Sequence, residues 1–134
     1  YREIVAGQYE KLIPGSFDLL NTEMAIRPDG PYGIGKAFGE ATGRYFSDQR
    51  GLSVMCLRIG TLNVESRPTN LRQFATLLTH GDLVRLVKAC IKGPDSIRFG
   101  IYYGVSNNKW RFWDISNSRK EIGYIPKDNA ETWR

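Results

Sequence analysis

A tyrosine and a lysine four residues apart, Tyr32 and Lys36, are the side chains of this sequence best suited to chemistry. On a helix, residues at this spacing lie on one face, one turn apart. An ammonium group beside a phenol favours the phenolate form. A tyrosine in that setting can take or give a proton near neutral pH. The pair therefore predicts an acid–base site carried by a helix.

The surrounding residues predict that helix over residues 32–49, with Pro31 at its entry and Gly51 at its exit. A helical wheel places an apolar stripe on one side, formed by Ile34, Ala37, Phe38, Ala41 and Tyr45. Tyr32, Lys36, Gly39 and Gly43 lie opposite. A glycine inside a helix costs about 1 kcal/mol relative to alanine. Gly39 and Gly43 therefore favour close approach by a neighbouring backbone or ligand over a neutral accident.

A strand is predicted next, over residues 53–60, because this continuous apolar run is typical of a parallel strand covered on both faces. Residues that follow such a strand line the ligand crevice of a doubly wound sheet. Here they are Gly60, Thr61, Leu62 and Asn63.

The remaining elements are a helix over residues 79–92, a strand over 97–105 and a short helix over 114–121, whereas residues 1–31 are predicted to be mostly irregular. Thr79 and Asp82 resemble a capping box at the start of the second helix. His80 beside them favours a local structural role over that of a catalytic base. The cluster of Trp110, Phe112 and Trp113 favours packing or a substrate pocket over stacking on nucleic-acid bases.

Composition excludes several classes of function. The net charge of +5 comes from 19 basic and 14 acidic residues that are dispersed along the chain, which argues against a nucleic-acid partner. No apolar run approaches the roughly 20 residues that span a bilayer, so no membrane role is expected. Cys56 and Cys90 lie in apolar surroundings. They predict free thiols in a reducing, cytoplasmic compartment and no metal site.

Several segments resemble, in order, the extended short-chain dehydrogenase/reductase family, and within it the uronate dehydrogenases and related NAD-dependent epimerase/dehydratase proteins. These segments are residues 27–63, with the Tyr-x-x-x-Lys pair and the Leu57-Arg58-Ile59-Gly60 run, then residues 79–94, 102–108, 112–116 and 123–131. The resemblance implies an α/β fold that forms the C-terminal part of a Rossmann-type doubly wound parallel sheet. It makes residues 1–134 a single α/β unit, with a loop region (1–31), the active-site helix and following strand (32–63), and substrate-side and C-terminal elements (64–134).

The same resemblance implies an NAD(P)-dependent oxidoreductase that acts on a sugar or a sugar acid such as a uronate. Tyr32 is then the general base, and Lys36 supports it and holds the nicotinamide ribose. Ile59, Gly60 and Thr61 join this pair at the cofactor. Thr61, Asn63 and Arg72 contact the substrate, with Arg72 preferred over Arg67 for a carboxylate because an arginine fork suits it. Related enzymes form a homodimer through the tyrosine-bearing helix.

The sequence departs from the family in lacking a glycine-rich turn after a first strand, where the family holds the cofactor pyrophosphate. The family's catalytic serine is also absent, since Ser16 lies too close to Tyr32. We therefore expect the N-terminal dinucleotide-binding strands to be missing from this chain and the chain alone to be inactive. Two alternatives stay open: a sugar-nucleotide epimerase or dehydratase, and a non-catalytic truncated relative that acts as an interaction module.

Overall fold

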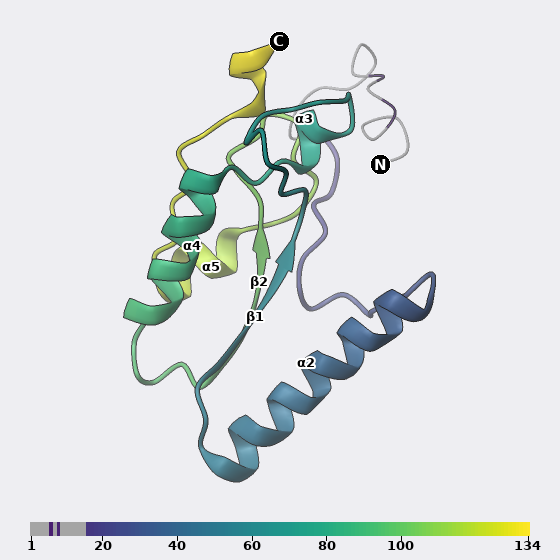
Figure 1. Ribbon diagram of the computed structural model, residues 1–134. Helices are drawn as coiled ribbons and strands as arrows, with labels where there is room; N and C mark the ends of the chain where they lie inside the picture. Colours follow the sequence, from purple (N-terminus) through teal and green to yellow (C-terminus); the bar gives the residue numbers. More distant parts are fainter. Residues whose placement is uncertain (1–5, 7, 9–15) are drawn as a thin grey trace.

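The described part of the chain forms a two-stranded parallel sheet with helices on both of its faces (Figure 1). The computed structural model describes residues 6, 8 and 16–134, so most of the first half of the predicted loop region lies outside it. In chain order the elements are α2 (Pro31–Arg50), β1 (Val54–Ile59), α3 (Gln73–Thr76), α4 (His80–Lys92), β2 (Phe99–Gly104), α5 (Ser116–Ile122) and the 3-10 helix η2 (Ala130–Trp133). This arrangement confirms the α/β class expected from the sequence.

The register of the sheet decides which side chains meet which helix. Val54 pairs with Phe99 at one end, and Ile59 pairs with Gly104 at the other. Since side chains alternate along a strand, Val54 and Cys56 face α2, where Gly43 approaches both of them. Met55 and Leu57 face the opposite way and pack with α4. One face of β1 therefore contacts α2, the candidate catalytic helix, and its other face contributes to the core.

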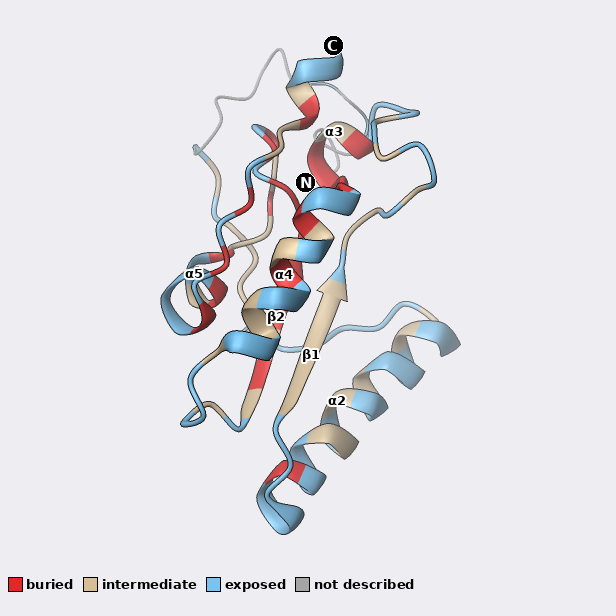
Figure 2. Cartoon of the chain, turned by 60° about the vertical axis from the view of Figure 1, so that its left-hand side comes forward, coloured by how far each residue is buried: buried red, intermediate tan, exposed pale blue. Residues whose placement is uncertain are grey.

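The core lies almost entirely on the α4 side of the sheet, as the burial colours of Figure 2 show. Leu86 of α4, Tyr102 of β2, and Ile122 and Tyr124 at the end of α5 form one buried cluster. On the other side, α2 contributes a single buried residue, Ser47, whose hydroxyl donates to the carbonyl of Arg98 at 3.1 Å. The apolar stripe of α4 is only partly used, because Ile91 remains 78% exposed.

The capping box predicted for α4 is half right. The Thr79 hydroxyl accepts from the Asp82 amide at 3.1 Å, as a cap should. The fully buried Asp82 carboxylate does not reach back to the Thr79 amide, however. It accepts from the backbone amides of Lys127 and Asp128 at 2.8 and 3.1 Å, because the C-terminal segment folds back over the start of this helix. A local sequence motif does not reveal such a distant partner.

The aromatic cluster supports the packing interpretation. Trp110 and Phe112 are buried against Ala75 of α3. Trp113 stacks on Tyr103 of β2, with ring centroids 5.7 Å apart. The cluster therefore joins α3 to the end of the sheet. No helix in the described part of the chain is both long and apolar enough to cross a membrane.

Candidate functional site

Tyr32 and Lys36 lie together on the first two turns of α2. The helix begins at Pro31, where a missing amide is tolerated, and ends at Gly51, whose left-handed conformation (φ 68°) closes it. The Lys36 ammonium lies over the Tyr32 ring, with Nζ 5.1 Å from the ring centroid. The Tyr32 side chain is 79% exposed. The predicted pair is therefore adjacent and accessible.

Gly43 allows the second half of α2 to lie directly on the sheet. A Cβ at this position would come within 2.9 Å of Val54 Cγ1 and would also meet Cys56 and Phe99. The approach is made by side chains of the sheet, whereas the sequence predicted a backbone or a ligand at this glycine. Gly39, one turn earlier, has no described atom within 4 Å of such a Cβ, so none of the described residues makes the close approach predicted there.

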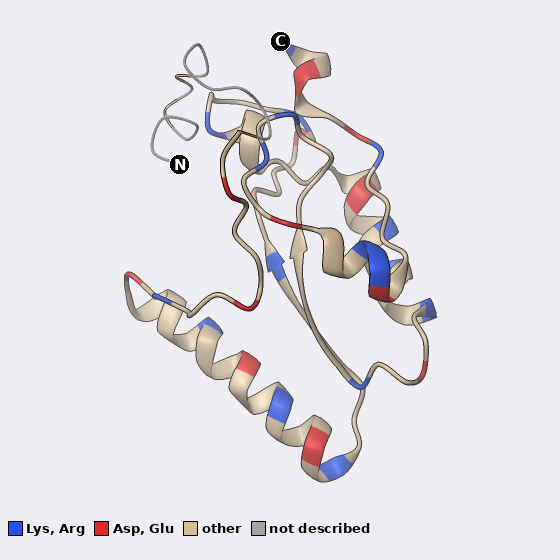
Figure 3. Cartoon of the chain, turned by 180° about the vertical axis from the view of Figure 1, so that it is seen from behind, with Lys and Arg blue, Asp and Glu red and all other residues tan. Residues whose placement is uncertain are grey.

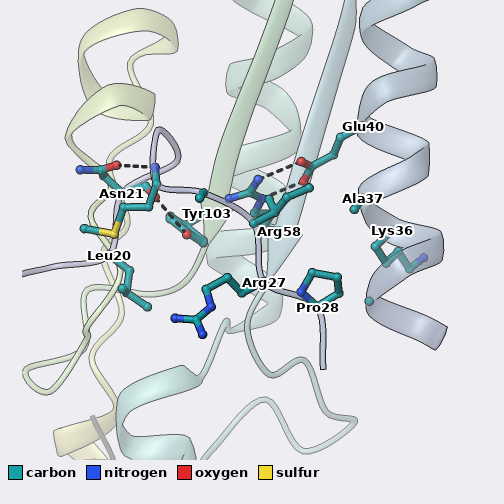
Figure 4. A pocket seen from close by; sticks show the side chains of 13 residues that line it. Leu20, Asn21, Arg27, Pro28, Lys36, Ala37, Glu40, Arg58 and Tyr103 are labelled. Carbon is teal, nitrogen blue, oxygen red and sulfur yellow. Dashed lines mark hydrogen bonds and ion pairs between the residues drawn. The ribbon is translucent and has the colours of Figure 1, made fainter. Parts of the chain in front are cut away.

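The first half of α2 stands away from the sheet and leaves two hollows beside Lys36. One has a volume of about 630 Å³ and lies between α2, the ends of β1 and β2, and residues 20–28 (Figure 4). The other, of about 460 Å³, lies between α2 and residues 56–59 of β1. Tyr32, Lys36 and Ile59 all line the second hollow. Ala37, which the helical wheel placed on the outward stripe, instead lines the first, because residues 20–28 cover that side of the helix.

An ion pair between Glu40 and Arg58 crosses from α2 to β1 between these hollows (Figure 4). It is bidentate, with Arg58 Nε and Nη2 at 2.7 and 2.8 Å from the two Glu40 carboxylate oxygens. The two side chains are 23% and 18% exposed. The hydrogen bonds to Glu40 raise the pKa of Arg58. The guanidinium also lies over the Tyr103 ring, 5.7 Å from its centroid.

The predicted substrate loop after β1 is held by contacts within the chain. Thr61 bonds Thr76 through both its amide and its hydroxyl, the two hydroxyl oxygens being 2.7 Å apart. The Asn63 side-chain amide donates to Gln73 Oε1 at 3.0 Å and to the carbonyl of Arg67 at 2.8 Å. His80 Nε2 lies 2.8 Å from the Asn63 carbonyl, which supports a local structural role for this histidine.

Arg72 lies at the start of α3 and its side chain is exposed. Arg67 is also exposed. The predicted site residues therefore separate into two groups: Tyr32, Lys36 and Ile59 share a hollow, whereas Gly60, Thr61, Asn63 and Arg72 line neither of the two. The sequence reasoning missed the Glu40–Arg58 pair. Two sequence features could have indicated this pair: Arg58 lies inside an otherwise apolar strand, and Glu40 lies one helical turn after Lys36.

The chain is similar in sequence to several sugar dehydrogenases. A scan against protein-family models matches none. The uronate dehydrogenase of Pseudomonas putida is 36% identical over 108 residues, which are 81% of this chain and 39% of that enzyme. The uronate dehydrogenase of Agrobacterium fabrum is 36% identical over 115 residues, which are 86% of this chain and 42% of that enzyme. The NAD-dependent glucose-6-phosphate dehydrogenase of Haloferax volcanii is 36% identical over 85% of this chain and 43% of that enzyme.

Solved structures agree with these relatives. The crystal structure of uronate dehydrogenase from Agrobacterium tumefaciens superposes with a TM-score of 0.80 at 35% identity, over 87% of this chain and 42% of that one. A tyrosine-to-alanine mutant of that enzyme, complexed with NAD, also superposes with a TM-score of 0.80, at 34% identity. The match covers 87% of this chain and 43% of the mutant chain. The chain spans about two fifths of the length of the curated relatives it matches.

Proposed function

We propose that this chain, a homologue of the uronate dehydrogenases, carries the catalytic tyrosine and lysine of an NAD-dependent dehydrogenase that oxidises a sugar acid. The observation that carries the proposal is the Lys36 ammonium over the exposed Tyr32 ring, at a hollow that Ile59 of the neighbouring strand also lines. We use "complete enzyme" for these residues together with a glycine-rich cofactor-binding half.

The residues beside the hollow fit the nicotinamide end of NAD. A volume of about 460 Å³ accommodates a nicotinamide and its ribose, and Lys36 offers a donor for ribose hydroxyls. The 134 residues contain no glycine-rich turn for the pyrophosphate, so they suit one end of the cofactor only. When bound, NAD supplies the hydride-accepting chemistry. Ile59, Gly60 and Thr61 complete the proposed contacts on the strand side.

The chain's own residues move the proton. The Tyr32 phenolate accepts the proton from the substrate hydroxyl that is oxidised, as a general base. The Lys36 ammonium, one helical turn away, stabilises the negative charge of that phenolate. The exposed position of Tyr32 leaves its oxygen open to a substrate.

Arg72, Thr61 and Asn63 form the proposed substrate side. An exposed arginine at the start of α3 can offer its fork to a carboxylate. Gln73, the next residue, is buried, and its Oε1 accepts from the Asn63 side-chain amide and from the Thr69 amide and hydroxyl, so the segment that carries Arg72 is held in place. The exposed fork, together with the similarity to uronate dehydrogenases, supports a carboxylate-bearing substrate such as a uronate.

The outward face of α2 supports a homodimer. Ile34, Phe38 and Tyr45 are 59%, 72% and 56% exposed, although all three are large and apolar. We include in the proposal that this helix pairs with its symmetry mate, in an interface where the same patch meets itself. The two free cysteines support a reducing, cytoplasmic location.

Substrate oxidation by the complete enzyme tests the function. We expect NADH to form when glucuronate or galacturonate is supplied with NAD, and little to form with glucose 6-phosphate or arabinose, which lack a carboxylate. Absorbance at 340 nm follows the reaction. Turnover of arabinose, which is uncharged, or of glucose 6-phosphate, which carries a phosphate, at the rate of the uronates would refute the carboxylate assignment. Absence of NADH with every sugar would refute the dehydrogenase.

A further inference from the structure

Charged side chains of alternating sign follow one another along α2 at intervals of four residues. They are Lys36, Glu40, Arg44 and Asp48, and the charge colours of Figure 3 show this alternation along the helix. Residues at this spacing are neighbours on a helix surface and form ion pairs when nothing competes. Arg44 and Asp48 do so, with Nε 2.8 Å from Oδ2.

Glu40 does not follow this pattern. Both of its carboxylate oxygens are occupied by Arg58 of β1, at 2.7 and 2.8 Å. Arg44, its other cationic neighbour on the helix, is paired with Asp48 and packs over the Phe99 ring at 5.3 Å. Within residues 16–134, Lys36 forms no ion pair and lies over Tyr32 instead.

We propose that Arg58 is a positioning residue of the active site, which holds the Glu40 carboxylate away from Lys36 and so leaves the Lys36 ammonium free to support Tyr32. The inference rests on the proposed function and assigns a role to two residues outside the Tyr-Lys pair. Without Arg58, Glu40 would stand one turn from Lys36 with its charge uncompensated. Lys36 would then be shared between a carboxylate and the phenolate, and the phenolate would lose support.

The other charged and titratable groups around Lys36 do not supply this effect. Arg27, from the segment before α2, and Tyr103, from β2, line the first hollow with Lys36, Glu40 and Arg58. Cys56 of β1 lines the second hollow with the last three of these, and burial raises the pKa of its thiol, which keeps the thiol neutral. Arg27 has no carboxylate partner among the described ion pairs, and the Tyr103 hydroxyl donates to the carbonyl of Asn21 at 3.4 Å. Glu40 is therefore the acidic side chain lining both hollows with Lys36, and Arg58 is the group that binds it.

A double-mutant cycle in the complete enzyme tests the proposal. The variants are Arg58→Met, Glu40→Gln and the two combined, with Arg44→Met as the matched control on the same helix. Two readouts are taken: the pH dependence of kcat/KM for uronate oxidation, and the titration of Tyr32 followed by NMR of ¹³Cζ-labelled tyrosine. The second readout needs no activity, so failure of the dehydrogenase assignment leaves the charge relationship testable.

For Arg58→Met we expect the acidic limb of the rate profile and the Tyr32 titration to move up by roughly 0.5 to 1 pH unit, since an opposite charge nearby shifts titrations by about this much or more. On the acidic limb this lowers kcat/KM by about 3- to 10-fold. Glu40→Gln should not move either midpoint upward. The combined variant should return both midpoints to those of the wild type, and Arg44→Met should leave them unchanged.

The combined variant is decisive because removing the Arg58 charge also acts on Tyr32 directly. A midpoint that stays raised in the combined variant would overturn the proposal, since Glu40 would then not carry the effect. An unmoved midpoint in Arg58→Met would overturn it as well. Arg58→Lys provides a second route if Arg58→Met folds poorly. This variant keeps a positive charge opposite Glu40 but loses the bidentate guanidinium. It should keep the midpoint of the Tyr32 titration within about 0.3 pH unit of the wild type.

Discussion

Gly43 of α2 lies against Val54 of β1 so closely that a Cβ on the glycine would come within 2.9 Å of the valine Cγ1. This contact fixes where the second half of the helix meets the sheet. Tyr32 and Lys36 lie two to three turns earlier on the same rigid element. A change at this contact therefore reaches the proposed catalytic pair through the helix itself.

Gly43→Ala should destabilise the chain by about 1 to 3 kcal/mol, since the added methyl group overpacks the contact with Val54. Gly39→Ala is the matched control, because no described atom lies within 4 Å of its added Cβ. The free energy of unfolding of this control should rise by up to about 1 kcal/mol, because alanine has a higher helix propensity than glycine. Urea unfolding of both variants measures the two free energies. A Gly43→Ala variant more stable than the wild type would contradict the close approach.

Tyr32→Phe in the complete enzyme should lower kcat by roughly 10²- to 10⁴-fold, the usual cost of losing a general acid or base, while leaving NAD affinity largely intact. Tyr45→Phe, which removes only the hydroxyl of an exposed tyrosine on the same helix, should leave kcat and NAD affinity unchanged. Lys36→Ala should lower both kcat and NAD affinity, because in the proposed mechanism the ammonium stabilises the phenolate and binds the ribose. Steady-state kinetics with uronate and NAD separate the three. Wild-type turnover in Tyr32→Phe would remove Tyr32 from the mechanism.

The isolated 134-residue chain should not bind NAD tightly. Its hollow beside Lys36 suits the nicotinamide end, whereas no glycine-rich turn offers amides to the pyrophosphate. Calorimetric titration with NAD and with NADP should show no saturable binding below the millimolar range. A micromolar dissociation constant would mean that the cofactor site has been misplaced.

Phe38→Asp should turn the proposed dimer of the complete enzyme into a monomer. Phe38 is 72% exposed on the outward face of α2, and an aspartate there would place an unpaired charge in the interface. Val64→Asp provides the control, since this 91% exposed valine lies in the loop after β1, away from the helix. Sedimentation velocity distinguishes the two species. A wild-type enzyme that is already monomeric at micromolar concentration would refute the dimer.

Local patterns predicted most of the regular structure. The helix expected over residues 32–49 is Pro31–Arg50, and the strand expected over 53–60 is Val54–Ile59. Helical periodicity, Pro31 and Gly51 lie within the segment itself, so they can be identified without knowledge of the fold. The short helix α3 escaped prediction because four residues offer no periodicity.

The parts of the fold and of the site that depend on distant partners could not be predicted. The Asp82 carboxylate is bound by amides 45 and 46 residues away, and the Glu40–Arg58 pair joins residues 18 apart. A helical wheel does not show which neighbour on another element takes a charge. For the same reason it placed Ala37 with the outward stripe, although residues 20–28 cover that side.

β1 pairs with β2 along one edge, and in the described part of the chain no named strand hydrogen-bonds to its other edge. The open edge presents a row of amides and carbonyls on a segment that is apolar apart from Arg58. Such an edge acts as a template for any other extended chain. Purified alone, this polypeptide should therefore self-associate through β1 as its concentration rises. Co-expression with a segment that supplies a matching strand should keep it in solution.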